Sequence, residues 1–396
     1  MSAALDLLVV GGGPGGAALA TLAAQAGLRV LLVERAHVPH GKVCGEFVSA
    51  EGCRVLERLG VLASLVGAGA RWIDSCAVAA GPRAQIEAPL PDLGRGQRAG
   101  LGVSRALLDR ALLDRAIAAG ATVLERHLAR PLDVSARALG ASIRRVGADR
   151  SEERVDARVL VAADGRGSAF AAAQRRRSRP TTSDRSWFGL QVHCAGTPAA
   201  LERRVELHAF DGGYVGLCGV EEQRINACLL VRVGALRRSG GDPARLFAER
   251  VQAEPSVRQA LGQAEPCSPW HAVGPLRWGL GLPAARGVLA VGDAAGTIDP
   301  LCGEGMSHAL RAAELALPHV VHAAVRGGVD AGVERAYALA WRREFRTATR
   351  RARALGLVLE HRALARVLLR TLALGAAPLA RPLVAWSRTG APADRS

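Results

Sequence analysis

Lysine is almost absent from this chain, and aromatic side chains are few. Lys42 is the only lysine, and aromatic residues make up 4% of the 396 positions, so the formal net charge of +16 rests on arginine. Proteins that hold single-stranded nucleic acids combine cationic grooves with aromatic rings that stack on the bases. Because the arginines are spread over predicted helices and do not gather beside aromatic residues, we expect no nucleic-acid partner.

Paired cysteines and long apolar runs are also missing. The eight cysteines form no CxxC pair, and no secretion signal precedes the first apolar run, so we expect free thiols and a cytoplasmic location. No apolar stretch reaches the roughly 18–20 residues that a membrane span needs. His193 and His208 alternate with apolar strand residues, and His319 and His322 lie on an apolar helix. Structural imidazoles are commoner than ligands in such patterns, and we expect no metal site.

The order of the apolar segments predicts an α/β fold with two interleaved domains. Residues 5–10 form an apolar run that ends in glycines, and an Ala/Leu-rich segment and a second apolar run follow, which indicates a β-α-β unit. Short β-rich runs between residues 187 and 232 predict an antiparallel sheet. We therefore expect a Rossmann-like parallel sheet that binds a nucleotide, an inserted antiparallel-sheet substrate domain and a helical C-terminus. Their ranges are, in that order, 1–70 with 100–170 and 285–330; 71–99 with 171–284; and 331–396.

Gly11, Gly13 and Gly16 form a GxGxxG pattern between the first predicted strand and helix. Glycines at these positions let the backbone approach a pyrophosphate, which the N–H groups at the start of the helix can bind. Glu34 ends the second strand about twenty residues further on, where a carboxylate can accept hydrogen bonds from an adenosine ribose, and Arg35 follows it. The pattern predicts a dinucleotide site, and alone it leaves NAD and FAD open.

A second group of glycines and carboxylates follows the strand predicted at 287–291. It comprises Gly292-Asp293-Ala294-Ala295-Gly296 and then Asp299-Pro300-Leu301-Cys302-Gly303-Glu304-Gly305-Met306. This segment resembles the second FAD fingerprint of the family that joins aromatic-ring hydroxylases, geranylgeranyl reductases and flavin-dependent halogenases. The resemblance implies that Asp293 binds the ribityl chain of FAD. It also implies that the cofactor is approached by Gly292, Gly303, Gly305 and Met306, with Pro300 and Cys302 on the flavin side of the substrate pocket.

Three other segments resemble the same family. Ser104–Asp109 is similar to a helix start whose arginine, here Arg105, reaches FAD, and Asp164-Gly165 is similar to an Asp-Gly motif beside the nucleotide. The segment Pro39–Glu46 resembles a loop of the geranylgeranyl reductases in which a Cys-Gly pair lies beside the flavin ring. Cys44 is therefore the first candidate for a catalytic side chain, with Pro300 and Cys302 as further candidates. A small buried hydrophobe is the alternative role of such a thiol.

The likeness to each branch of the family is incomplete. The aromatic-rich Tyr-x-Trp-x-Phe-Pro stretch of the geranylgeranyl reductases is here reduced to Gly213-Tyr214. Ala295-Gly296 stands where ring hydroxylases usually carry a histidine, and the tryptophan-rich signature of the halogenases is absent. From strand alternation we expect an apolar substrate site lined by Val192, Phe210, Tyr214 and Leu217.

These features predict an FAD-dependent oxidoreductase that acts on a small apolar organic molecule. Our first hypothesis is a monooxygenase that hydroxylates an aromatic or polyketide-like substrate, with the redox chemistry supplied by the cofactor. The alternative is reduction of carbon–carbon double bonds in an isoprenoid, as in the geranylgeranyl reductases. No second GxGxxG pattern occurs, so NADPH or NADH is expected to visit as a transient electron donor.

The C-terminal segment supports a third hypothesis, a lipid-binding protein at a membrane surface that retains a redundant nucleotide fold. Leucines and arginines alternate between residues 350 and 370 in a basic amphipathic pattern. Such helices can also cover the protein's own core or an oligomer interface. If these helices bind lipid, we expect peripheral membrane contact through them. The sequence leaves the oligomeric state open.

Overall fold

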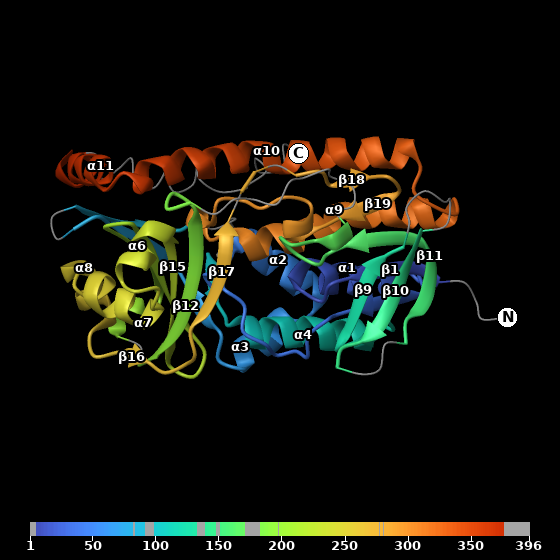
Figure 1. The fold of residues 1–396 in the computed structure, drawn as a ribbon, viewed down its shortest axis with the longest axis horizontal. Helices are drawn as coiled ribbons and strands as arrows, with labels where there is room; N and C mark the ends of the chain where they lie inside the picture. Colours follow the sequence, from blue (N-terminus) through green and yellow to red (C-terminus); the bar gives the residue numbers. More distant parts are fainter. Residues whose placement is uncertain are drawn as a thin grey trace.

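A mainly parallel sheet forms the centre of the first domain (Figure 1). The computed structural model describes residues 5–81, 84–91, 99–132, 139–147, 151–170, 183–196, 198–276, 278–279 and 281–375. The sheet runs in the order β18, β19, β11, β1, β2, β8, and its neighbours pair in parallel apart from β18 and β19. The hairpin of β9 and β10 joins β11 in antiparallel fashion. The strand bounds are β1 Leu5–Val10, β2 Val30–Val33, β8 Thr122–Leu124, β9 His127–Pro131, β10 Leu139–Arg145, β11 Glu153–Ala162, β18 Ala284–Ala285 and β19 Val288–Ala290.

Helices pack against this sheet and bury its continuous apolar strands. Helix α1 packs between α4 and α9, and all three contact strands of the sheet. Helix α2 packs on α9. The shared core contains the buried strand residues together with Leu19, Leu112 and Leu310. The helix bounds are α1 Pro14–Gln25, α2 Ala50–Leu59, α3 Leu62–Gly67, α4 Arg105–Ala118 and α9 Gly305–Val325.

A second, curved sheet forms the other domain, on the left in Figure 1. It runs in the order β16, β12, β15, β14, β13, β5, β6, with β17 also on β12, and all these pairs are antiparallel except β13 with β5. Short helices cover its outer face. The strand bounds are β5 Ser75–Ala79, β6 Gln85–Pro89, β12 Trp187–Ala195, β13 Arg204–Phe210, β14 Gly213–Val220, β15 Arg224–Arg232, β16 Glu265–Pro266 and β17 His271–Leu276; the helices are α6 Val233–Arg238, α7 Pro243–Leu246, η2 Phe247–Val251 and α8 Pro255–Leu261.

A small antiparallel sheet lies where the two domains meet. Strand β7 (Gly100–Gly102) pairs with β3 (Phe47–Ser49) on one side and β4 (Arg71–Ile73) on the other. Glycine is needed at Gly102, since a Cβ there would lie 2.1 Å from the carbonyl oxygen of Gly219 in β14. This close approach brings the Cys44 loop, which precedes β3, against the antiparallel sheet.

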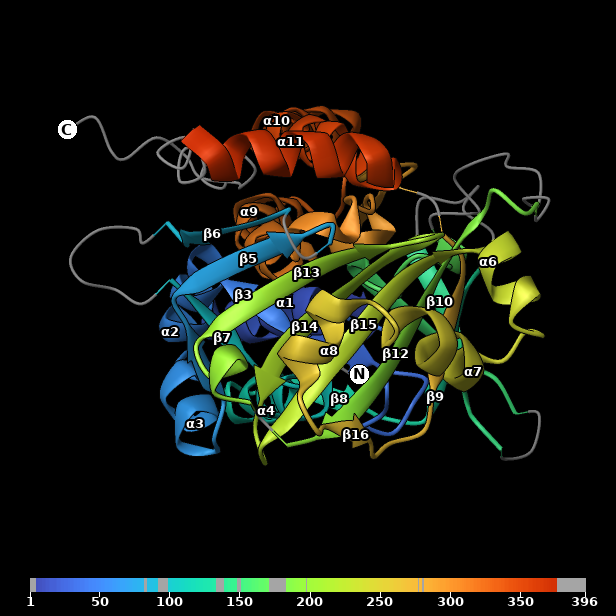
Figure 2. The same cartoon turned by 90° about the vertical axis from the view of Figure 1, so that its left-hand side faces the viewer.

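The C-terminal helices cover both domains. Helix α10 (Ala331–Glu360) runs along the top of the molecule, and α11 (Arg362–Gly375) continues it across β5 and β6 (Figures 1 and 2). Tyr337, Trp341 and Phe345 of α10 are buried in the core of the parallel-sheet domain, and the Tyr337 hydroxyl donates to the carbonyl of Ala290 at 2.8 Å. The first half of α10 thus belongs to that core, while α11 packs on the other domain.

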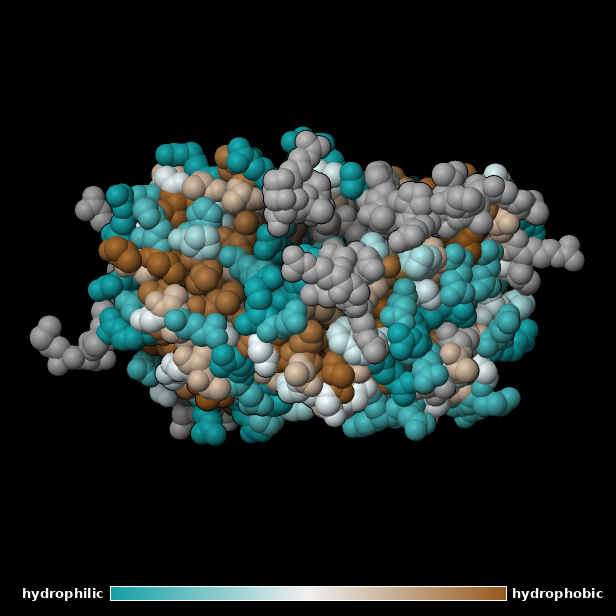
Figure 3. Space-filling model, turned by 180° about the vertical axis from the view of Figure 1, so that it is seen from behind, coloured by the Kyte–Doolittle hydropathy of each residue, from teal (hydrophilic) through white to brown (hydrophobic). Residues whose placement is uncertain are grey.

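Polar residues cover much of the face turned away from the viewer in Figure 1, with apolar areas between them (Figure 3). Within the described part of the chain, no helix is both long and apolar enough to cross a bilayer. The sequence has a run of three arginines at 175–177, which lies outside the described residues.

Candidate functional site

The glycine turn between β1 and α1 leaves room for a ligand at one position and is tightly packed at two others. Gly11 has a φ of 110°, and a Cβ there would lie 2.3 Å from the carbonyl oxygen of Ala163. A Cβ on Gly16 would lie 1.9 Å from the carbonyl oxygen of Gly11. Gly13 faces open space, and the closest atom to its Cβ position is Nη2 of Arg105 at 3.9 Å. Because α1 has no side-chain cap, its first N–H groups remain available to an anion at this opening.

Glu34 is buried at the end of β2, directly behind the glycine turn. Its carboxylate oxygens accept hydrogen bonds from the backbone N–H groups of Gly12, at 2.7 Å, and Ala36, at 2.9 Å. Each oxygen has a further lone pair, so the carboxylate can still accept a bond from a ribose hydroxyl. Arg35, beside it, is exposed.

Arg105 begins α4 and extends toward the same turn. Ser104 caps the helix with its hydroxyl, as the sequence predicts, and the Arg105 guanidinium binds both carboxylate oxygens of Asp109, at 2.9 and 2.6 Å. Burial opposes the charge of Arg105, but the attraction of Asp109 overcomes it and raises the pKa of Arg105. Lys42 Nζ lies 3.8 Å from Asp109 Oδ2. These cations can stabilise the negative charge of a pyrophosphate.

Asp164 follows β11 and retains an unused acceptor. Its Oδ2 accepts a hydrogen bond from the backbone N–H of Ala169 at 2.9 Å, while Oδ1 is buried without a hydrogen-bond partner among the described residues. Burial raises the pKa of this carboxyl, against hydrogen bonds that lower it. A buried acceptor without a donor costs free energy, so this atom is placed for a bond from a ligand. Gly165 follows with a φ of 78°.

Asp293 lies in the η3 turn Gly292–Ala294 after β19, on the same side of the sheet. Its side chain is 39% exposed, and its Oδ2 is 3.6 Å from Nε of Arg166. Its partial burial raises its pKa, while the charges of Arg166 and Arg105 oppose the shift. Since Arg105 also faces Gly13, Asp293 and the glycine turn belong to one site.

The loop after Asp293 leads into α9. Gly303 has a φ of 66°, and a Cβ there would lie 3.2 Å from Cδ1 of Phe47. Gly305 opens α9 with no atom within 4 Å of its Cβ position, which leaves the start of this helix open. The Met306 side chain is buried in the parallel-sheet core, so a ligand could meet only its backbone.

Together these residues fit FAD. The opening at Gly13 with its adjacent cations suits a pyrophosphate, Glu34 suits the adenosine ribose, and Asp293 suits the polyol chain of a flavin. The unpaired oxygen of Asp164 lies within the same group of strand ends. The structure therefore brings together predicted cofactor residues from four separate segments: the glycine turn with Glu34, Arg105, Asp164 and the Asp293 loop.

A cavity of about 230 Å³ adjoins the Asp293 loop. It lies between Pro300–Gly303, the inner face of the antiparallel sheet and the C-terminal helices. Its walls are mainly aliphatic side chains, thiols and glycines. Arg166 is the charged side chain among the described lining residues, and it stands on the side of Asp293. The cavity therefore suits an apolar molecule.

The three predicted catalytic residues all line this cavity: Cys44, Pro300 and Cys302. Burial raises the pKa of the Cys44 thiol, so it keeps its proton at neutral pH, and its sulfur accepts a hydrogen bond from the backbone N–H of Glu46 at 3.4 Å. Asn226 Nδ2 donates to the carbonyl of Cys44 at 2.9 Å, which fixes the loop to β15. The loop thus stands between the cofactor residues and the substrate sheet.

The predicted substrate residues require a correction. Tyr214 lines the cavity, but Val192, Phe210 and Leu217 lie on the opposite face of the sheet, in the core beneath the short helices. Successive strand residues face opposite sides, so Tyr214 and Leu217, three positions apart, cannot share a face. The side chains that accompany Tyr214 are instead Leu207, Cys228 and Leu230.

Sequence reasoning missed two further parts of the site. One is Glu46, which is buried and has a positive φ of 53°. Its carboxylate accepts a hydrogen bond from the backbone N–H of Arg105 at 2.9 Å and pairs with Nε2 of His193 at 2.7 Å. It therefore ties the Cys44 loop to α4 and to β12. The other missed part is the roof of the cavity, which Leu355, Leu369 and other residues of α10 and α11 supply.

Ion pairs attach this roof to the two domains. Arg353 of α10 lies 3.5 Å from Oδ2 of the buried Asp299 and 2.7 Å from Glu360, which also pairs with Arg232 of β15 at 3.0 Å. Asp299 also caps the turn Pro300–Cys302 by accepting a bond from Leu301 N. Burial raises the pKa of Asp299 to about 6, while the hydrogen bond from Leu301 and the charge of Arg353 oppose the shift.

Comparison with known proteins assigns this arrangement to a family. The model of the FAD-binding domain family matches residues 4–342. The chain is 31% identical over 369 residues to digeranylgeranylglycerophospholipid reductase of Methanothrix thermoacetophila, covering 85% of this chain and 83% of that protein.

Solved structures show the same fold in proteins of different chemistry. A geranylgeranyl bacteriochlorophyll reductase-like protein from Thermoplasma acidophilum has a TM-score of 0.74 at 22% identity. The match covers 93% of this chain and 90% of that protein's chain. The myxobacterial chondrochloren halogenase CndH has a TM-score of 0.78 at 20% identity, with coverages of 96% and 92%. The fold therefore does not distinguish reduction from oxidation.

Proposed function

Since this chain belongs to the FAD-binding domain family and is an FAD-dependent oxidoreductase of that family, we propose that it saturates carbon–carbon double bonds in an isoprenoid chain. The observation that carries this proposal is the aliphatic cavity beside Cys44 and the Pro300–Gly303 loop, extended under α10 and α11. The relatives named as digeranylgeranylglycerophospholipid reductases support it over the hydroxylation that we first expected from the sequence.

The walls of the cavity suit a flexible hydrocarbon. Leu207, Leu230, Leu355 and Leu369 surround it, and burying apolar surface against such walls stabilises a ligand by roughly 25 cal/mol per Å². Closing this space with α11 also keeps water from the reacting bond. When bound, FAD would supply the two-electron chemistry, with NADPH or NADH as the proposed source of electrons.

Cys44 is proposed as the proton donor. Saturation adds one hydride and one proton to each double bond, and the Cys44 thiol carries a proton at the wall of the cavity. Its loop is fixed from two sides by Glu46 and Asn226, which holds Sγ in place. The thiol would recover its proton from solvent or from a neighbouring group between turnovers.

The test is anaerobic turnover of the full chain loaded with FAD. The enzyme, reduced with NADPH, NADH or dithionite, is incubated with a geranylgeranyl lipid, and the product is analysed by mass spectrometry. A gain of one H₂ per double bond supports the proposal. A product that forms only with O₂ and gains oxygen would overturn it in favour of a monooxygenase.

The variant Cys44→Ala should slow the proton-dependent step about 10²-fold or more, in the range of general acid catalysis. The matched control is Cys53→Ala, which removes a buried thiol of α2 that lies in the parallel-sheet core. Equal rates in the two variants would exclude Cys44 as the donor while leaving reduction itself open.

A further inference from the structure

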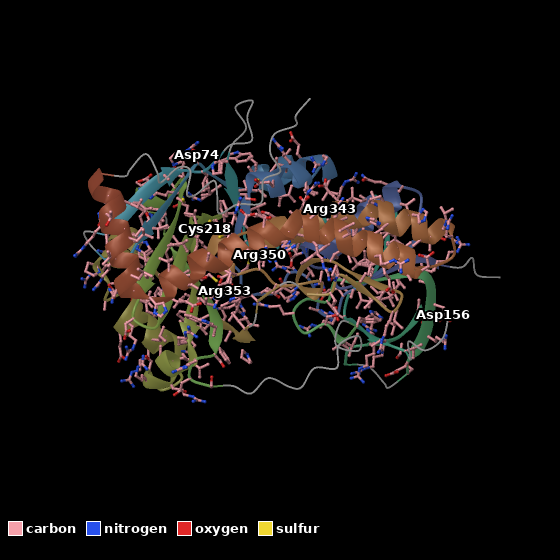
Figure 4. The ribbon with its side chains drawn as sticks, turned by 90° about the horizontal axis from the view of Figure 1, so that it is seen from above. Asp74, Asp156, Cys218, Arg343, Arg350 and Arg353 are labelled. Atoms are coloured by element: carbon pink, nitrogen blue, oxygen red, sulfur yellow. The ribbon has the colours of Figure 1, made fainter. Side chains whose placement is uncertain are left out.

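The C-terminal helices combine two surface properties on the upper side of the molecule. In α10, exposed arginines recur at helical spacing at positions 335, 342, 343, 346 and 350. Figure 4, which looks down on this layer, shows Arg343 and Arg350 along α10. Among the described residues of α10 and α11, all exposed charged side chains are arginines. This side of the protein therefore attracts anions.

Helix α11 adds apolar side chains to the same layer. Leu364 is 52% exposed and Val367 is 65% exposed, although both belong to residue types that are usually buried. They lie one turn apart, so they share one outer stripe of the helix. Leu357, near the end of α10, is 44% exposed. The apolar stripe and the arginine row lie on helices that follow one another along the top of the molecule (Figure 1).

The opposite stripe of α11 lines the cavity. Ala365, Leu369 and Leu372 are buried and face the cavity, together with Leu368. Leu368 is nevertheless 38% exposed, so it stands at the boundary between the cavity and the surface. Helix α11 is thus apolar on both sides, and one layer of side chains separates the cavity from the exterior.

Polar contacts and apolar packing with the described residues hold α11 in this position. Arg366 Nε donates to the carbonyl of Ala80 at 2.8 Å, and Arg362 pairs with Glu254. Its buried face packs on the turn between β5 and β6, at Ala80 and Ala84, and on Ala209, Val78 and Ile86 of the sheet. Among the described residues, α11 is therefore held by these two polar contacts and by the packing of Ala365 and Leu369 against β5 and β6.

We propose that the α10–α11 face docks on the surface of an anionic lipid bilayer and that α11 admits an apolar substrate from it into the cavity. The arginines of α10 attract the anionic headgroups, and Leu364 and Val367 enter the interface. The docking is argued from the exposed side chains of α10 and α11 alone, whereas the admission of substrate rests on the proposed function. Leu368 marks the route between bilayer and cavity.

The test is flotation of the full, FAD-loaded chain with vesicles. Vesicles of phosphatidylcholine mixed with an equal part of phosphatidylglycerol should carry the protein upward, and pure phosphatidylcholine should carry much less. The variant Leu364→Gln/Val367→Gln should lower partitioning about tenfold or more, because two interfacial apolar side chains are lost. Wild type that stays unbound to anionic vesicles, or a variant that floats like wild type, would overturn docking.

A matched control changes two side chains of similar exposure elsewhere. Ile117 in α4 is 50% exposed and Val146, after β10, is 48% exposed, and α4 lies on the opposite side from α10 (Figure 1). The variant Ile117→Gln/Val146→Gln should float like wild type, and a matching loss in this control would show that the effect is not specific to α11.

Activity separates the admission of substrate from the reaction itself. The α11 variant should lose rate on a vesicle-embedded geranylgeranyl lipid and keep the rate on a short isoprenoid dissolved in detergent. If the variant and wild type had equal rates on both substrates, the role of α11 as a route would be overturned. Failure of wild type on both substrates with flotation intact would instead reject the proposed function and leave docking supported.

Discussion

The cofactor site and the cavity are neighbours, but they are built in different ways. The cofactor site consists of backbone turns at strand ends, where Gly11, Gly13 and Gly16 and the carboxylates of Glu34 and Asp293 hold fixed places. The cavity consists of side chains from three separate parts of the fold, the Cys44 loop, the antiparallel sheet and α10–α11. Turns tolerate few substitutions, whereas an apolar wall tolerates exchange of one aliphatic residue for another. We therefore expect changes at the turns to have larger effects than changes in the wall.

The largest effect is expected at the glycine turn. In Gly16→Ala the new Cβ would lie 1.9 Å from the carbonyl oxygen of Gly11, and backbone must move to relieve the clash. We expect loss of bound FAD and a decrease in the free energy of unfolding of about 3 kcal/mol, measured from absorbance and denaturant titration. Gly167→Ala, which has no atom within 4 Å of its Cβ position, is the control. Retention of FAD in Gly16→Ala would contradict the assigned role of the turn.

The next largest effect is expected at Asp293. Replacing its carboxylate in Asp293→Asn weakens hydrogen bonds to a polyol, and bonds to charged groups contribute roughly 1.5–3 kcal/mol. The Kd for FAD, measured by fluorescence quenching, should rise about 10- to 100-fold. Asp156→Asn, which changes an exposed carboxylate of β11 paired with Arg154, should bind FAD as wild type does. An unchanged Kd in Asp293→Asn would remove this residue from the site.

Asp299 provides a test at the junction of the two regions. Its pKa is about 6, above the usual 3.8, so the folded state holds this proton more tightly than the unfolded state. The associated stability is complete below the unfolded pKa and is lost as pH rises through about 6. Asp299→Asn keeps an oxygen that can cap Leu301 and does not titrate. As pH rises from 4 to 7, its free energy of unfolding should therefore rise by about 2–3 kcal/mol relative to that of wild type. A difference that stays constant over this window in denaturant titrations would contradict the buried, protonated carboxyl.

The smallest effect is expected in the cavity wall. The Tyr214 hydroxyl is buried and has no hydrogen-bond partner among the described residues. Tyr214→Phe should leave stability unchanged or raise it by about 1 kcal/mol, since an unsatisfied polar group is removed. Thermal unfolding at fixed pH measures this change. A clear loss of stability would show that the hydroxyl makes a bond within the protein.

The same contrast explains what the sequence could predict. The glycine turn, Glu34, Asp164 and the Asp293 loop depend on local patterns, and the structure places them together as expected. The helix start at Ser104–Asp109 also depends on a local signal, and Ser104 caps α4 there. Of the residues predicted at the substrate pocket, Cys44, Pro300, Cys302 and Tyr214 line the cavity.

Three predicted substrate residues do not line the cavity, because residues distant in sequence decide which face of the sheet it occupies. Val192, Phe210 and Leu217 are apolar strand residues, but which face of the sheet is the cavity depends on where the short helices α6, α7 and α8 pack. The roof formed by α11 follows from its packing over β5 and β6, which no local pattern specifies. The parallel pairing of β5 with β13 likewise joins segments more than a hundred residues apart.

A crystal structure of the FAD-loaded protein tests the central claim most directly. The account predicts that the pyrophosphate lies at Gly13, that Asp293 binds the ribityl chain, and that the flavin ring forms a wall of the cavity beside Cys44 and Pro300. A flavin ring separated from this cavity, or a cofactor held at another edge of the parallel sheet, would contradict it.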